Sequence, residues 1–286
     1  MKRVKVGGLD FAWREWGSGD VTVLFIHGNL ASKDWIELAT PHFTPGIRTI
    51  AVDWRGCGDS DKPAPLPDFS NYSIARHADD MLGVLDALNI SFCHLATHST
   101  GGIISSRMLL KQPERFGRVL ALDPVAPQSF IFPPDKAAFF GQMKMSKTLT
   151  RQVMAMTAVS LFDPQALATG TVRLRENAGP RAALFEKIAE QAFSVSDGIW
   201  FGTPYALTME ARTGWLKAHM EQLHHPHLVL WGMLDNIIQL DDLRYMASHM
   251  PDCRLVTVPG VGHSMNVEAP ELFAGHYNGW FGGLPH

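Results

Sequence analysis

Residues 95–102 read Leu-Ala-Thr-His-Ser-Thr-Gly-Gly, so that a short apolar run passes through a serine into two glycines. Residues 92–96 have the length and composition of a buried strand, and residues 101–110 carry apolar side chains at helical spacing. A serine that follows a strand and precedes a helix lies beside a helix N-terminus, which favours developing negative charge. Ser99 is therefore a candidate nucleophile, although these eight residues alone also fit a serine in an ordinary strand-to-helix loop.

The chain around this stretch alternates between strand-length and helix-length segments. Residues 72–88 place apolar side chains three to four residues apart behind a possible N-cap at Ser73, which predicts a long amphipathic helix. Two short runs on either side of Gly7-Gly8 predict a hairpin that leads into the sheet. Five further apolar runs are candidate buried strands: residues 21–26, 49–52, 118–122, 228–231 and 254–258. This alternation predicts an α/β fold with a mostly parallel central sheet flanked by helices.

The alternation stops between about residue 127 and residue 225. Helical sequence rich in Met and Phe replaces the strands there, and prolines mark both ends of the segment. We interpret residues 127–225 as a helical cap inserted after the sixth strand. Residues 1–126 and 226–286 then form the core domain.

Composition narrows the class of protein and its partners. The 286 residues are 46% hydrophobic and 19% charged, with a net charge of −3 and no Lys/Arg run, so neither nucleic acid nor an anionic membrane is an expected partner. No apolar stretch approaches the roughly 18 residues of a membrane span. Glycines follow the basic N-terminus where a signal peptide needs an apolar core. Three widely spaced cysteines suit reduced thiols, which predicts a cytoplasmic protein; Cys57, in a glycine-flanked loop, is a weaker candidate nucleophile.

Residues 95–102 resemble the nucleophile elbow of the α/β-hydrolase superfamily, with Gly101 at the family's downstream glycine and Thr97 where the upstream glycine usually stands. Two other segments strengthen this resemblance. Phe-Ile-His-Gly-Asn at 25–29 resembles the family's oxyanion segment, which makes the backbone N–H groups of Asn29 and Thr100 candidate oxyanion donors. Residues 53–60, Asp-Trp-Arg-Gly-Cys-Gly-Asp-Ser, resemble a segment that members of this family carry after their next strand. We interpret it as scaffold and not as part of the catalytic machinery.

Near the C-terminus, His263 lies in a glycine-rich loop after the last predicted strand, at the family's position for the catalytic base. A serine hydroxyl is a weak nucleophile at neutral pH, so it needs an imidazole that accepts its proton and later returns it. His263 is the candidate base. We expect His98 to lie in the pocket wall and His27 to organise the oxyanion loop.

Two aspartates could orient the His263 imidazole. Asp235 follows the run at 228–231 and resembles the family's usual acid, whereas Asp123 occupies an alternative acid position known in some members of the fold. We favour Asp235, because the chain order serine, acid, histidine and the loop context both match. Asp123 would then be structural and anchor the entrance to the cap.

The resemblance implies acyl transfer at Ser99 on a small-molecule ester or lactone, through an acyl-enzyme. The sequence offers no metal-ligand cluster and no phosphate-binding loop, so no metal or cofactor is predicted. One alternative is a carbon-carbon bond hydrolase of ring-fission products, with a cap arginine for the substrate carboxylate. Another is a non-hydrolytic ligand receptor on the same fold. The candidate arginines are Arg151, Arg173 and Arg175, and the cap aromatics that could shape an apolar pocket are Trp200, Phe201 and Trp215.

Overall fold

The computed structural model describes residues 1–284 and contains one sheet of eight strands in the order β1-β2-β4-β3-β5-β6-β7-β8. The first two strands pair antiparallel as the predicted hairpin, and the six that follow along the chain are parallel to one another. The strand bounds are β1 Lys2–Val6, β2 Leu9–Trp16, β3 Val21–Ile26, β4 Ile47–Val52, β5 Cys93–His98, β6 Phe116–Leu122, β7 His227–Gly232 and β8 Cys253–Val258. The predicted α/β class and mostly parallel sheet are thus confirmed.

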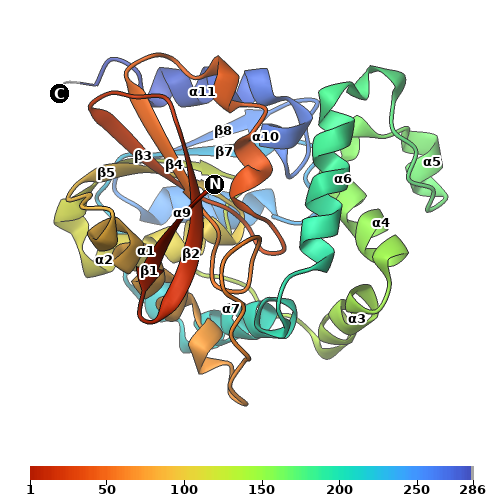
Figure 1. Ribbon diagram of the computed structural model, residues 1–286, viewed down its shortest axis with the longest axis horizontal. Coiled ribbons are helices and arrows are strands. Elements are labelled where there is room, and N and C mark those ends of the chain that lie inside the picture. The colour runs from red at the N-terminus through yellow and green to blue at the C-terminus, as the bar shows by residue number, and fades with distance from the viewer. Residues whose placement is uncertain (285–286) are drawn as a thin grey trace.

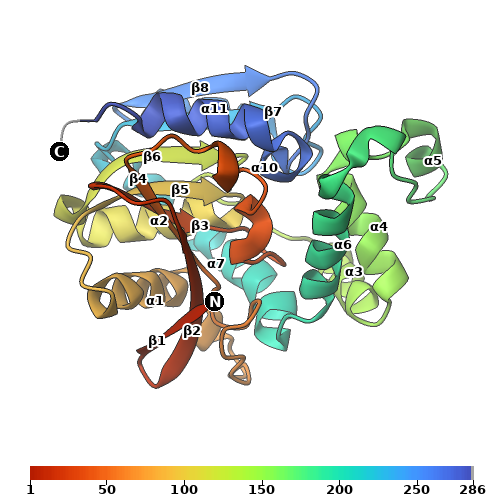
Figure 2. The ribbon, with the colours of Figure 1, turned by 45° about the horizontal axis from the view of Figure 1, so that its top comes forward.

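Helices flank this sheet, as Figures 1 and 2 show. Helix α1 (Ile74–Ala87) begins after the predicted N-cap, where the Ser73 hydroxyl oxygen accepts a hydrogen bond from the Arg76 amide. Helix α2 (Thr100–Lys111) starts immediately after Ser99 and packs against α1. Near the C-terminus, α11 (Pro270–Phe281) packs against β6, while α9 (Leu240–His249) packs against β8 and α10 (Met265–Glu268) precedes α11. Within residues 1–284, no helix combines the length and apolar character that crossing a bilayer requires.

The segment between β6 and β7 is helical, as the sequence predicts. Helices α3 to α6 lie to one side of the sheet in both views, whereas α7 returns to the core and contacts α1 (Figures 1 and 2). That 127–225 is a separate cap domain stays a prediction. The helices of this segment are α3 Pro134–Lys144, α4 Lys147–Thr157, α5 Pro164–Ala168, α6 Pro180–Phe193, α7 Thr203–Thr213 and α8 Trp215–Ala218.

The segment at 53–60 is a buried polar scaffold in the loop after β4. The carboxylate of Asp53, fully buried, accepts hydrogen bonds from the Lys33 ammonium and from the Lys33 amide. Arg55 forms a bidentate ion pair with Asp80 on α1, at 2.5 and 2.6 Å. Gly58 has a φ of +46°, and a Cβ there would lie 2.2 Å from the Asp53 carboxylate. These contacts fix the loop to the core, in agreement with a scaffold role.

Strand register determines which loops meet. Ile26 pairs with Thr97, His98 with Leu122, and Leu122 with Leu230. Because these strands are parallel and in register, the residues that follow each of them lie at one edge of the sheet. The segments after β3, β5, β6, β7 and β8 therefore converge there.

Candidate active site

Ser99 occupies a strained turn between β5 and α2. Its φ of +53° and ψ of −122° lie outside the ordinary regions for a residue with a side chain. Close backbone contacts hold this conformation: the Ser99 amide donates to the Leu122 carbonyl at 3.0 Å, and a Cβ on Gly101 would lie 2.2 Å from the Ile26 carbonyl oxygen. The glycine after the serine is therefore required by packing against β3. The geometry is that of a nucleophile elbow, and Thr97 does not prevent it.

His263 and Asp235 form a buried hydrogen-bonded pair near this turn. The imidazole Nδ1 lies 2.8 Å from Asp235 Oδ2, and the exposed fractions of the two side chains are 5% and 0%. Asp235 Oδ1 also accepts hydrogen bonds from the amides of Ile237 and Ile238. Burial alone would raise the pKa of Asp235, but the charge and hydrogen bond of His263, together with these amides, lower it. Of the two candidate acids, Asp235 is the one hydrogen-bonded to His263; its catalytic role stays a prediction.

The hydrogen-bond partner that the structure gives the Asp123 carboxylate lies outside the inserted segment. Asp123 Oδ1 accepts a hydrogen bond from the Gly232 amide at 2.8 Å, in the loop that follows β7. One carboxylate oxygen of Asp123, one of Asp235 and one ring nitrogen of His263 lie within 4.8 Å of one another. The reason is the register of the sheet, because β6 and β7 are neighbours and their carboxyl ends coincide. Both sequence candidates for the acid thus converge on one imidazole.

The loop after β3 brings one candidate oxyanion donor, Asn29, beside Ser99, and the other, Thr100, directly follows Ser99 at the start of α2. A Cβ on Gly28 would lie 2.9 Å from the Ser99 Cβ, so only glycine allows this approach. Neither the Asn29 nor the Thr100 N–H donates a hydrogen bond to another group in the described part of the chain. His27 contacts the Gly28 carbonyl through Nδ1 and accepts from the Trp54 amide at Nε2, and burial lowers its pKa to about 3. A neutral His27 therefore fixes the loop, as expected.

His98 contributes a contact that the sequence did not suggest. Its Nε2 donates to the backbone carbonyl of His263 at 2.9 Å, and its ring lies 4.8 Å from the His263 ring and 5.1 Å from the Trp35 ring. Burial, and next the charge of His263, lower the pKa of His98 to about 3, so the ring is neutral. His98 lines the cavity wall as expected and also holds the His263 backbone. Its position next to Ser99 at the end of β5 was the available signal.

Ser99 and His263 open onto a cavity of about 240 Å³. Among its described lining residues, Lys136 is the single charged side chain, and it is exposed. Most of the wall is apolar and comes from the inserted segment together with a few core residues. The apolar side chains include Leu30, Trp35, Val125, Phe130, Phe132, Phe139, Phe140, Met143 and Met154.

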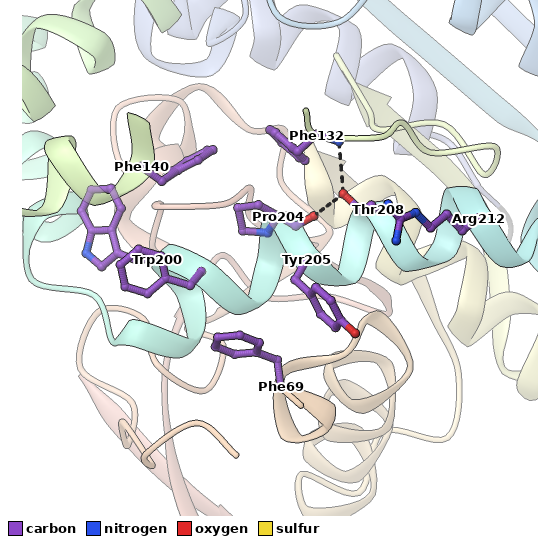
Figure 3. A pocket seen from close by; sticks show the side chains of 9 residues that line it. Phe69, Phe132, Phe140, Trp200, Pro204, Tyr205, Thr208 and Arg212 are labelled. Carbon is purple, nitrogen blue, oxygen red and sulfur yellow. Dashed lines mark hydrogen bonds between the residues drawn. The ribbon is translucent and has the colours of Figure 1, made fainter. Parts of the chain in front are cut away.

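A second cavity of about 330 Å³ shares two of these phenylalanines with the first. Phe132 and Phe140 line both cavities, and Figure 3 shows them facing the second cavity from one side of α7, with Phe69 and Tyr205 on the other side. The Thr208 hydroxyl connects α7 to the chain at Phe132, because it accepts a hydrogen bond from the Phe132 amide and donates one to the Pro204 carbonyl (Figure 3). The cavity at Ser99 and this aromatic cavity are therefore neighbours that share two phenyl rings.

The cap residues considered in the sequence lie elsewhere. Trp200 and Phe201 line the second cavity, and Trp215 stacks with the Arg107 guanidinium at 4.1 Å, so none of the three borders Ser99. All three candidate arginines are engaged away from the catalytic cavity: Arg151 pairs with Glu186, Arg173 with Asp163, and Arg175 donates to the Phe162 carbonyl. Helical spacing alone does not show which face of each helix meets the cavity.

Cys57 is fully buried, and burial raises the pKa of its thiol well above the ordinary value. A buried neutral thiol is a poor nucleophile. Ser99 is the better candidate.

Comparison with known proteins assigns the family. A family model described as the alpha/beta hydrolase fold matches residues 21–270. The 2-(acetamidomethylene)succinate hydrolase of Mesorhizobium japonicum is 26% identical over 95% of this chain and 91% of its own length. The 2-hydroxy-6-oxo-6-phenylhexa-2,4-dienoate hydrolase of Burkholderia cepacia is also 26% identical, over 90% of this chain and 86% of its own length.

A solved structure of Est816, described as an N-acyl homoserine lactone degrading enzyme, superposes with a TM-score of 0.76 at 23% identity, covering 98% of this chain and all of that one. The protein belongs to the family of the α/β-hydrolase fold. This membership, together with full-length relatives named as hydrolases, supports hydrolase activity.

Proposed function

We propose that the protein is a serine hydrolase that cleaves a carboxylic ester or lactone of a small, largely apolar substrate. The observation that carries this proposal is the convergence of Ser99, on its strained elbow, with the hydrogen-bonded pair of His263 and Asp235. Ser99 and His263 line the same cavity. A nucleophile, a base and a group that orients the base are the parts that acyl transfer needs.

In the proposed mechanism, Ser99 Oγ attacks the carbonyl carbon while His263 Nε2 accepts the hydroxyl proton. The N–H groups of Asn29 and Thr100 donate to the oxyanion of the tetrahedral intermediate, and the N-terminus of α2 adds its dipole. Collapse of this intermediate transfers the proton from His263 to the leaving alcohol. Water then attacks the acyl-enzyme by the same steps, and the acid product leaves.

The cavity supports a neutral, small acyl group as the preferred substrate part. Its volume of about 240 Å³ is below the roughly 300–1,000 Å³ of sites that hold drug-sized ligands. Its described wall offers one cation, Lys136, and no arginine. We also propose that residues 127–225 act as the cap of this site, because Phe132, Phe140 and Met154 supply its apolar wall.

Carbon-carbon bond hydrolysis is the second candidate, because one full-length relative is named as a dienoate hydrolase. A dienoate carries a carboxylate, and the three cap arginines that could bind it are engaged elsewhere. The geometry therefore favours the ester or lactone. Product analysis with a lactone and with a dienoate substrate separates the two reactions.

The test is hydrolysis of p-nitrophenyl acyl esters of increasing chain length by the native protein and by Ser99→Ala. We expect turnover with short acyl chains, and a loss of at least about 10³-fold in kcat in the variant. Ser248→Ala, which removes an exposed serine on α9, is the matched control and should keep full activity.

A folded Ser99→Ala protein with undiminished turnover would exclude Ser99 as the nucleophile. Activity in neither protein with esters or lactones would favour the dienoate reaction, or a ligand receptor if the dienoate is not cleaved either.

A further inference from the structure

Asp123 places a second carboxyl group beside the candidate triad, where the mechanism above does not use it. The side chain is fully buried, at the end of β6. Asp123, Asp235 and His263 each offer one atom to a group whose atoms all lie within 4.8 Å of one another. Glu268 is the next acidic group whose charge acts on Asp123, and it accepts hydrogen bonds from the amides of Gly262 and Ser264.

Two buried carboxylates this close, which share one neighbouring imidazole, do not both stay ionised. Their hydrogen bonds show which one holds the negative charge. Asp235 accepts from the His263 ring and from two backbone amides. Asp123 accepts from one backbone amide, Gly232, through Oδ1, and its buried Oδ2 has no donor among the described residues. The oxygen without a donor is the one on which a proton is placed most easily.

The electrostatic surroundings of the two groups agree with this assignment. Burial raises the pKa of Asp123 well above its ordinary value, and the charge of Asp235 raises it further. The pKa of Asp235 is lowered, because His263 and the two amides outweigh its burial.

We propose that Asp123 is a protonated carboxylic acid that donates a hydrogen bond from Oδ2 to the Asp235 carboxylate and so positions Asp235 against His263. The effect of Asp123 on turnover rests on the proposed function, whereas its protonation does not depend on that function. During acylation the proton of Ser99 moves to His263 and Asp235 stays anionic, while Asp123 keeps its own proton. Asp123 is thus a positioning residue whose hydrogen bond limits the basicity of Asp235.

Two variants separate this role from a structural one. In Asp123→Asn, the amide can still accept from Gly232 and donate to Asp235, and asparagine tolerates the φ of +41° at this position. We expect it to keep most of the native kcat/KM and an unshifted acidic limb of the pH profile. Asp123→Gly tolerates the same φ but removes the donor, so kcat/KM should fall by about ten- to a hundredfold. Without that donor Asp235 stabilises the His263 imidazolium more strongly, so the acidic limb should move to higher pH.

The opposite protonation state predicts a different result. If Asp123 were an ionised carboxylate, Asp123→Asn would remove a negative charge beside the imidazole and move the acidic limb to lower pH. That shift would overturn the proposal, as would equal losses in the two variants.

Infrared difference spectroscopy tests the proton without any turnover. The native protein minus Asp123→Asn, at pH 7 to 8, should show the C=O stretch of a protonated carboxylic acid, which is distinct from carboxylate bands. If only carboxylate bands appear, the proposal is wrong. Because this readout needs no substrate, it still decides the state of Asp123 if Ser99→Ala shows that the proposed function is wrong.

Discussion

The carboxyl edge of the sheet and the helical segment between β6 and β7 place their side chains by different means. At the sheet edge, hydrogen bonds hold two carboxylates in place: Asp235 accepts three, and Glu268 accepts from two amides of the His263 loop. The wall of the cavity that comes from residues 127–225 is mostly apolar side chains. Hydrogen bonds are directional and apolar packing is not, so the edge fixes the relative positions of its polar groups, while the segment fixes mainly the size and shape of the cavity.

Substitutions in the two regions should therefore have different effects. Substitutions at the sheet edge should lower the rate of the chemical step for every substrate. Substitutions in the helical segment should change which acyl group is preferred.

The largest effect is expected at Asp235. In Asp235→Asn an amide replaces the carboxylate that contacts His263 Nδ1, so the imidazole no longer has a charge to stabilise its protonated form or to fix its tautomer. We expect kcat to fall by about 10⁴-fold for short and long acyl esters alike. Asp241→Asn, at an exposed aspartate paired with Arg244, is the control. A loss of less than about tenfold would contradict the assigned acid and the expected difference between the two regions.

Acid should lower the free energy of unfolding, because histidines buried in the core stay neutral in the folded state. His77 is fully buried, neither ring nitrogen has a partner among the described residues, and burial followed by the charge of Arg55 lowers its pKa to about 3. Below its ordinary value of 6.5 the unfolded chain binds a proton that the folded state does not. Stability is therefore lost as pH falls from about 6.5 towards 3, by up to about 1.4 kcal/mol per pH unit for this group.

His77→Phe should remove this contribution, so that urea denaturation gives a smaller fall in the free energy of unfolding between pH 7 and pH 5. His224→Phe, at an exposed position, should leave the fall unchanged. If His77→Phe showed the native pH dependence, the buried ring would already be charged in the fold. The histidines whose pKa burial lowers to about 3 or 4 all lie outside residues 127–225: His27, His77, His98 and His227.

The smallest effect concerns the partition between the two cavities. Phe140→Ala removes a ring that lines both of them, so the catalytic cavity should extend into its aromatic neighbour. We expect the ratio of kcat/KM for long to short acyl esters to rise by about tenfold, with kcat for the short esters little changed. Phe201→Ala, which enlarges only the second cavity, is the matched control. Equal changes in both variants would show that the two rings do not separate the cavities.

Much of the core could be predicted from the sequence, because buried parallel strands are short apolar runs that end at recognisable turns. The predicted run at 92–96 illustrates the limit: β5 extends to His98, because register with β6 and not composition sets where the strand ends. Ser99, His263 and Asp235 could be selected as candidates because each lies in a loop with its own local pattern. Their roles stay predictions until activity is measured.

What the sequence did not reveal depends on contacts between distant residues. His98 donates to a carbonyl 165 residues further along the chain, and no local pattern encodes such a pair. Asp123 lies at the end of a strand, as many other residues do. Its proximity to Asp235 follows from the pairing of β6 with β7. In the segment between β6 and β7, Phe132 and Phe140 line the cavity at Ser99 while Trp200 does not, because tertiary packing decides which way each side chain points.

The helical segment leaves the sheet at the end of β6 and returns at the start of β7, and these two strands are direct neighbours, paired from Val119 with His227 to Leu122 with Leu230. In topological terms it is one long insertion whose two ends attach to a single pair of neighbouring strands. The entropic cost of closing such an insertion grows only with the logarithm of its length. We therefore expect that this segment can be lengthened, shortened or exchanged at little entropic cost, which would change the wall of the cavity while the strand ends that carry Ser99, Asp235 and His263 stay as they are.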